Sequence, residues 1–142
     1  MKNNGRLYNL NHCTYRCEYH LVWTPKYRGH TMADKYIKSQ LKRIIKMICT
    51  WKHVRIIAWH ICDDHIHLYL LITPKYSVAY IVGLVKSKSS AWVKKTNRKI
   101  PKGSFWCVGY FCSTIGINEY AIKTYIANQE KKMKDLPKLP LE

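Results

Sequence analysis

Two histidines separated by a single residue, His65 and His67, form a candidate metal-binding pair. Side chains alternate along a β-strand, so both imidazoles would lie on one face of a strand, about 7 Å apart at the backbone. Imidazoles are common metal ligands, and two of them at this separation can converge on one ion. A His-x-His pair is a weak signal by itself, because two surface histidines beside a turn give the same pattern.

A tyrosine and a glutamine near the C-terminus, Tyr125 and Gln129, are four residues apart. On a helix this spacing places them on one side, one turn apart, beside the apolar Ile122, Ile126 and Met133. A tyrosine hydroxyl next to a metal ion can serve as a nucleophile, and a glutamine carbonyl oxygen can add a neutral ligand to two imidazoles. An amphipathic helix with Tyr125 in the core and Gln129 at its rim would show the same spacing.

The elements that must position these residues alternate in type along the chain. Their β-branched and aromatic composition predicts strands over residues 15–24, 54–62, 65–73 and 105–112. Helical periodicity and capping residues predict helices from Asp34 to Trp51, from Ser77 to the basic loop at Thr96, and from Asn118 to about Met133.

The order β-α-β-β-α-β followed by one helix is the split βαβ, or ferredoxin-like, pattern. We therefore predict an α+β fold in which an antiparallel sheet has helices on one face and a C-terminal helix carries Tyr125. The length fits a single domain over residues 1–142, with a frayed tail at about 135–142. In this fold Asp63 and Asp64 read most simply as the turn between two strands.

The charge of the chain indicates a polyanionic partner. Lys and Arg number 25 against 8 Asp and Glu, which gives a net charge of +17 and favours nucleic acid. The shortage of carboxylates argues against a two-metal nuclease or a carboxylate-triad recombinase. Six basic residues are candidate contacts to DNA phosphates: Lys38, Lys42, Lys86, Lys94, Lys95 and Arg98.

No stretch of the sequence approaches the roughly 20 apolar residues that would span a bilayer, and the N-terminal residues lack a signal-peptide pattern. We therefore expect a cytoplasmic protein. Because the cytosol is reducing, the six cysteines are expected to be thiols rather than disulfides.

The residues resemble one known family, the single-tyrosine HUH transposases of the IS200/IS605-like group, whose superfamily includes the REP-associated tyrosine transposases. The likeness spans nearly the whole chain and rests on several ordered motifs. These are the segment from Tyr19 to Arg28 (YHLVWTPKYR), the Asp64–Leu68 segment DHIHL, the Gly109–Gly116 segment GYFCSTIG, and Tyr125 with Gln129. Several motifs in the right order are far more specific than any one of them.

The resemblance implies a transposase that binds the hairpin ends of an insertion sequence and cleaves and rejoins single-stranded DNA. It implies Tyr125 as the nucleophile of a 5′-phosphotyrosine intermediate, and a divalent ion, Mg²⁺ or Mn²⁺, held by His65, His67 and Gln129. It also implies a homodimer in which the tyrosine helix of one subunit completes the metal site of the other.

Two other functions stay open on the sequence. A non-catalytic nucleic-acid-binding module of ferredoxin-like fold would also be basic and aromatic, but the RNP-type signature of such modules is missing. An HUH nickase that serves replication or a domesticated function would share the chemistry, and only its DNA target would separate it from a transposase. The sequence names no general base for Tyr125.

Overall fold

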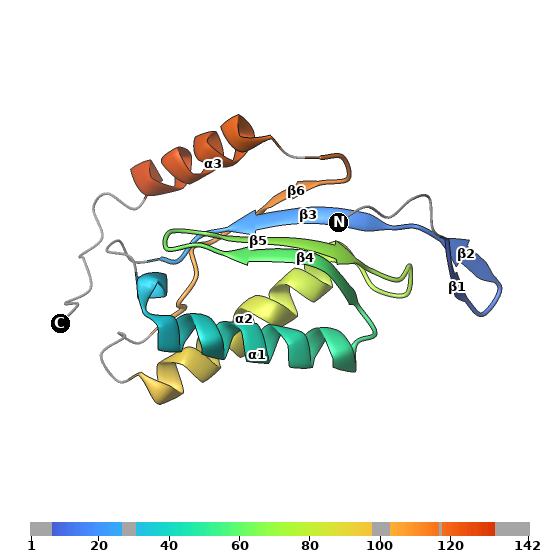
Figure 1. Cartoon of the computed structure of the whole chain (residues 1–142), viewed down its shortest axis with the longest axis horizontal. Helices are drawn as coiled ribbons and strands as arrows, with labels where there is room; N and C mark the ends of the chain where they lie inside the picture. Colours follow the sequence, from blue (N-terminus) through green and yellow to red (C-terminus); the bar gives the residue numbers. More distant parts are fainter. Residues whose placement is uncertain (1–6, 27–30, 98–102, 117, 133–142) are drawn as a thin grey trace.

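The computed structural model describes residues 7–26, 31–97, 103–116 and 118–132 (Figure 1). The predicted contact Arg98 and the predicted frayed tail lie outside these ranges. The strands are β1 (Tyr8–Leu10), β2 (Cys13–Tyr15), β3 (Glu18–Trp23), β4 (Arg55–Ile61), β5 (Ile66–Leu71) and β6 (Phe111–Ser113). A 3₁₀ turn, η1 (Thr31–Ala33), precedes the helices α1 (Lys35–Trp51), α2 (Val78–Thr96) and α3 (Glu119–Lys132).

Four strands form one antiparallel sheet in the order β4-β5-β3-β6. The first and third of these strands in the sequence, β3 and β5, are neighbours in the middle, and the second and fourth, β4 and β6, lie at the edges. This is the strand order of the split βαβ pattern, so the predicted α+β fold is confirmed. The remaining strands, β1 and β2, form a separate hairpin that extends beyond the sheet (Figure 1).

The helices begin where short polar side chains cap them, and the sequence predicts two of these caps, Ser77 and Asn118. The Asp34 carboxylate accepts from the backbone N–H of Tyr36 at 2.8 Å, and the Ser77 hydroxyl accepts from that of Tyr80 at 3.0 Å. Each cap satisfies an N–H that has no partner within the first turn of its helix. At α3 the side chain of Asn118 accepts from the N–H of Ala121 at 2.8 Å.

The core lies between one face of the sheet and the pair α1 and α2. The sheet contributes fully buried side chains that alternate along the two central strands, namely Leu21, Trp23, Ile66, Leu68 and Leu70. The helices contribute apolar residues at helical spacing, among them Leu41, Ile45, Ile48, Ile81, Val82 and Val85. Because this face is closed by two helices, the residues between the core positions of β5 point to the opposite face.

Helix α3 lies on the other side of the sheet from α1 and α2 (Figure 1). Only two of its described residues are buried, Ile126 and Gln129. Tyr125 meets the ring of Phe111 edge-on, with the ring centroids 5.9 Å apart. The C-terminal helix is therefore attached to the sheet by a small contact near β6.

One predicted strand is wrong in its extent. The sequence predicts a strand over 105–112, whereas β6 covers only Phe111–Ser113, and Trp106 makes a single bridge to Pro25. The backbone turns at Gly109, whose φ is +95°, a conformation that side chains on Cβ disfavour. The segment before it pairs with residues 24–26 through two backbone hydrogen bonds, from Lys26 to Phe105 and from Cys107 to Thr24. It is also held by hydrogen bonds with side chains of α2, which composition does not reveal. The β1–β2 hairpin was also not predicted.

Across the described ranges, no helix is both long enough and apolar enough to cross a membrane. All six cysteines are free, as expected, with Cys49 and Cys107 buried.

Candidate active site

His67 is the second residue of β5 and lies near three other histidines. Its register partners are His60 on β4 and Val22 on β3. The Nε2 atom of His67 is 3.3 Å from Nδ1 of His20, and its ring centroid is 5.5 Å from that of His20 and 6.1 Å from that of His60. The face of the sheet opposite α1 and α2 thus carries a histidine cluster, which we define as His20, His60, His65 and His67.

Burial and the neighbouring histidines keep His67 uncharged. Burial is the largest cause, followed by His20, His60 and His65, and together they lower the pKa of His67 from 6.5 to about 4. Burial likewise lowers the pKa of His20. A neutral imidazole has a lone pair, whereas a protonated one has none. At neutral pH His67 therefore has the protonation state that a metal ligand needs.

His65 directly precedes β5 and is oriented by a carboxylate. Its Nδ1 lies 2.8 Å from Oδ1 of Asp64, and its side chain is only 15% exposed. An ionised carboxylate can only accept, so the proton is on Nδ1 of His65 and the Nε2 lone pair is free. This carboxylate–histidine arrangement is the usual way in which proteins orient a metal-binding imidazole. Asp64 therefore orients His65 in addition to forming the turn that the sequence predicts.

Tyr125 and Gln129 lie together on α3, as their spacing predicts. The Nε2 group of Gln129 donates to the hydroxyl oxygen of Tyr125 at 3.0 Å and to the carbonyl oxygen of Val108 at 3.2 Å. A backbone carbonyl only accepts, so the atom that faces Val108 must be the amide nitrogen. The carbonyl oxygen Oε1 of Gln129 is therefore the atom that could bind a metal ion. Gln129 is only 2% exposed in this chain.

Tyr125 is a weak acid in this position. Burial is the largest cause that raises its pKa, from 10.0 to about 12, while the hydrogen bond from Gln129 lowers it and Cys107 raises it slightly further. The hydroxyl is therefore a protonated phenol at neutral pH. Its use as a nucleophile needs a group that takes the proton or stabilises the phenolate.

The structure brings the candidate residues together as two pairs rather than as one site. Within the described part of the chain, no hydrogen bond or ring contact joins Tyr125 or Gln129 to the histidine cluster. Nor do three His, Cys, Asp or Glu side chains there form a group able to hold a metal ion. Phe111, Val22 and His67 are register neighbours on successive strands, so Phe111 and His67 are about 10 Å apart at the backbone.

The sequence did not identify His20 and His60 as members of the cluster. Both lie in segments correctly predicted as strands, and alternation could place each on a face of its own strand. Their approach to His67 depends on the register between strands, which pairs His60 with His67 and His20 with Tyr69. Register is not visible in the composition of a single strand.

The candidate DNA-contact lysines differ in whether their ammonium groups already have a partner within the protein. Lys38 and Lys42 line a shallow depression of about 320 Å³ on α1, and Lys38 is paired with Asp63 at 2.8 Å. Lys95 is exposed near the end of α2, and Lys94 donates to the carbonyl of Gly103. Lys86 has two carbonyl partners inside the protein, at Cys107 and Gly109.

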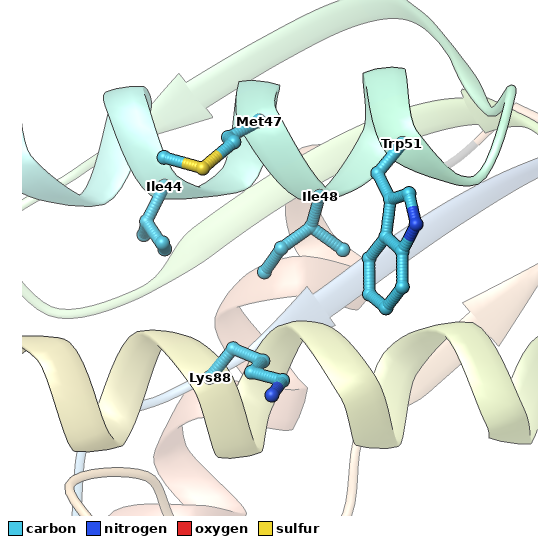
Figure 2. Close-up of a pocket in the computed structure, with 5 residues that line it drawn as sticks. All are labelled: Ile44, Met47, Ile48, Trp51 and Lys88. Atoms are coloured by element: carbon cyan, nitrogen blue, oxygen red, sulfur yellow. The ribbon is translucent and has the colours of Figure 1, made fainter.

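A second hollow, of about 220 Å³, lies between α1 and α2, on the side of the sheet opposite the histidine cluster. Figure 2 shows its lining, with four α1 residues above Lys88 of α2. The α1 residues are Ile44, Met47, Ile48 and Trp51. These four side chains are largely apolar, and Lys88 adds one amine without a second polar group beside it in the lining, so the candidate site stays on the histidine face.

Comparison with known proteins identifies close relatives. The family profile described as "Transposase IS200 like" matches residues 13–129. The transposase for insertion sequence element IS200 of Salmonella typhimurium is 36% identical over 138 residues, which cover 93% of this chain and 90% of the relative. The ISDra2 transposase TnpA of Deinococcus radiodurans is 29% identical over 123 residues, covering 83% and 87% of the two chains.

Solved structures agree with the sequence relatives. A putative transposase from Deinococcus radiodurans superposes with a TM-score of 0.73 at 28% identity, over 86% of this chain and 97% of that one. A REP-associated tyrosine transposase bound to a REP hairpin superposes with a TM-score of 0.57 at 11% identity, over 88% and 73% of the two chains. The second likeness is one of fold.

Proposed function

Because the chain belongs to the family of IS200-like transposases, we propose that it binds hairpin ends of an insertion sequence and cleaves and rejoins single-stranded DNA through Tyr125. One observation carries the proposal: the Tyr125 hydroxyl is held 3.0 Å from the Gln129 amide, on a helix facing the same side of the sheet as the histidine cluster. The bond fixes the direction of the hydroxyl oxygen, which an in-line attack needs in addition to a group that takes the proton.

The proposed cleavage forms one bond and breaks another. Tyr125 Oη attacks the scissile phosphorus, the new Oη–P bond forms, and the bond between phosphorus and the 3′ oxygen breaks. Oη loses its proton, and the departing oxygen gains one to become a 3′-hydroxyl. The products are a 5′-phosphotyrosine and a free 3′ end. Joining is the reverse reaction with another 3′-hydroxyl, so the phosphoester is conserved and no ATP is needed.

The residues that would hold a divalent ion are His65, His67 and Gln129. The donor set fits such an ion: His67 is neutral, the Nε2 lone pair of His65 is free, and Oε1 of Gln129 has no hydrogen bond in the described structure. Two imidazoles with one amide oxygen suit Mn²⁺, while the oxygen ligand and water suit Mg²⁺. When bound, the ion would stabilise negative charge on the reacting phosphate.

We propose that two copies of the chain assemble and that the α3 of one copy serves the histidine cluster of the other. The support is that Ile126 and Gln129 are the only buried residues among those described in α3, and that no hydrogen bond or ring contact in the described structure joins Tyr125 to the histidine cluster of the same chain. A movement of α3 within one chain is the competing arrangement, and mixing experiments with two inactive variants separate the two.

The DNA partner is supported by charge. A net charge of +17 attracts phosphates, and Lys38, Lys42, Lys94, Lys95 and Arg98 are the proposed contacts. One protein of the same fold was solved with a REP hairpin bound. For this chain we propose a hairpin in the flanks of its own gene as the bound DNA, with an unpaired strand beside it as the substrate.

The test is a denaturing gel of the protein with labelled single-stranded DNA from those flanks, in the presence of Mn²⁺ or Mg²⁺. A metal-dependent adduct that survives denaturation is expected for the wild type and is lost in Tyr125→Phe. Tyr120→Phe is the matched control, because Tyr120 lies on the same helix and is 78% exposed. An adduct that persists in Tyr125→Phe, or DNA binding without any adduct in the wild type, would overturn the proposal.

A further inference from the structure

Three successive carbonyls in the segment before β6 are held from two sides. Lys86, in the middle of α2, donates from Nζ to the carbonyl oxygens of Cys107 at 2.7 Å and Gly109 at 2.9 Å. Gln129 on α3 donates to the carbonyl oxygen of Val108, between them, at 3.2 Å. The outer two carbonyls thus turn toward α2, and the middle one turns toward α3.

Lys86 differs from the exposed lysines that give the chain its charge. Its side chain is half-buried, and burial lowers the pKa of its ammonium group. Hydrogen bonds from a charged donor are stronger than neutral ones, so two of them can offset part of the cost of taking the ammonium out of water. The contacts fix the backbone at the point where Gly109, with its positive φ, turns the chain.

The same segment is attached to α2 at two further points. The hydroxyl of Ser90 accepts from the N–H of Phe105 at 2.8 Å, and that of Ser89 accepts from the indole N–H of Trp106 at 2.8 Å. These bonds hold residues 105 and 106, and the N–H of Cys107 donates to the carbonyl of Thr24 at 2.9 Å. Among the described residues of α2, Lys86 extends the attachment to the carbonyls of Cys107 and Gly109, on either side of the carbonyl that meets α3.

Helix α3 depends on this short segment for its position. With only Ile126 and Gln129 buried among its described residues, the helix has little apolar packing, and the bond from Gln129 to Val108 connects it to the segment before β6. The same amide group of Gln129 donates to Tyr125. The direction of the Val108 carbonyl therefore sets where the Gln129 amide, and with it the Tyr125 hydroxyl, is held.

We propose that Lys86 is a positioning residue for Tyr125, acting through the carbonyls of residues 107–109 and through Gln129. This inference rests on the proposed function, in which Tyr125 is the nucleophile. Lys86 itself touches neither the reacting phosphate nor the tyrosine. Its charge is used inside the protein, which distinguishes it from a lysine that contacts DNA.

The first test needs no catalysis. The chain holds only two glutamines, Gln40 and Gln129, so selective ¹⁵N labelling of glutamine gives two pairs of side-chain amide resonances. Lys86→Met keeps an unbranched apolar side chain and removes the donors. We expect it to shift or broaden the Gln129 resonances. Those of Gln40, whose amide donates to Thr96 at 2.7 Å, should stay in place and report that the fold is intact.

The second test measures single-turnover adduct formation with saturating hairpin DNA, alongside the affinity for that DNA. Misplacing a reacting group by a fraction of an ångström to 1 Å costs on the order of tenfold to a hundredfold in rate. We expect Lys86→Met to show a rate loss of that size with an affinity within about twofold of wild type. Lys86→Arg, which keeps charged donors, should recover part of the rate.

Lys88→Met is the matched control, because Lys88 lies on the same helix and lines the hollow next to α1 instead. It should change neither the Gln129 resonances nor the rate. If Lys86→Met fails to fold, Lys86→Gln, which keeps a polar end, takes its place. Combining the Lys86 variant with Gln129→Ala should slow the reaction no more than Gln129→Ala alone. The reason is that Lys86 is proposed to act on Tyr125 through Gln129, so its effect is already lost when Gln129 is removed.

Several results would overturn the inference. Unshifted Gln129 resonances in a folded Lys86→Met protein would show that Lys86 does not position the amide. A weaker DNA affinity with an unchanged rate would make Lys86 a DNA contact. If the rate losses of the two single variants multiply in the double variant, Lys86 does not act through Gln129. If the wild type forms no adduct while the resonances shift as expected, the proposed function fails and the positioning of Gln129 by Lys86 still stands.

Discussion

The Gln129 amide donates to the Tyr125 hydroxyl oxygen across 3.0 Å, one turn away on the same helix. This bond favours the phenolate, yet burial outweighs it and raises the pKa of Tyr125 to about 12. The pair therefore orients the oxygen without ionising it. The hydroxyl loses its proton only when a higher pH, or another group that is present when DNA is bound, removes it.

The rate of adduct formation should rise with pH. Because the pKa of Tyr125 is about 12, the phenolate fraction below that pKa increases about tenfold for each pH unit. We expect the single-turnover rate to climb steeply between about pH 6.5 and pH 9, where the phenol is still mostly protonated. Quench-flow or gel assays at constant metal concentration measure this. A flat profile over the window would show that deprotonation of Tyr125 is not limiting.

Asp64→Asn should weaken metal binding more than it weakens the fold. The Asp64 carboxylate orients His65 at 2.8 Å, and losing such a partner typically costs 10- to 100-fold in metal affinity. A titration of adduct formation with Mn²⁺ should therefore shift to higher concentration by about that factor. Asp63→Asn is the control, since Asp63 pairs with Lys38 on α1 at 2.8 Å. Equal shifts in the two variants would argue against the orienting role.

Without added metal, the stability of the protein should fall as pH is lowered from about 6.5 to 4. The folded pKa of His67, about 4, lies below its ordinary value of 6.5, so in this window the unfolded chain binds more protons than the folded one. Stability is then present above pH 6.5 and is lost progressively below it. Because the side chain is only half-buried, we expect a change on the order of 1 kcal/mol after solvent screening.

Urea unfolding at pH 4.5 and pH 7 measures this change. His67→Gln, which cannot take up a proton in this range, should lose part of the difference between the two pH values. His53→Gln is the control, because His53 is exposed in the turn after α1. The same pH dependence in wild type and His67→Gln would assign the effect to other groups.

Ser89→Ala should destabilise the fold through Trp106. The Ser89 hydroxyl accepts from the indole N–H at 2.8 Å, and both side chains are almost fully buried. Removing the acceptor leaves a buried donor without a partner, which costs about 1–3 kcal/mol. Thermal and urea unfolding give the change, and Ser87→Ala, at an exposed position of the same helix, should be close to neutral. A neutral Ser89→Ala would mean that another group or a water replaces the acceptor.

Much of the fold could be predicted from local patterns. The apolar spacing of α1, the caps at Ser77 and Asn118, and the alternation along β5 each follow from backbone geometry over a few residues, and each was confirmed. The segment 105–110 was misjudged because its aromatic composition is typical of a strand. Its actual path depends on a short pairing with residues 24–26 and on Lys86, Ser89 and Ser90, which are 15 to 23 residues away in sequence.

For the candidate site, the sequence by itself determined which residues share a face: His65 with His67 by strand alternation, and Tyr125 with Gln129 by helical spacing. These relationships hold because the repeat of each backbone fixes the directions of nearby side chains. Tertiary structure alone decided that His20 and His60 surround His67, that Lys86 holds two carbonyls beside Val108, and that the two pairs lie apart within one chain. Those contacts depend on strand register and on where a weakly packed helix lies, which no local repeat encodes.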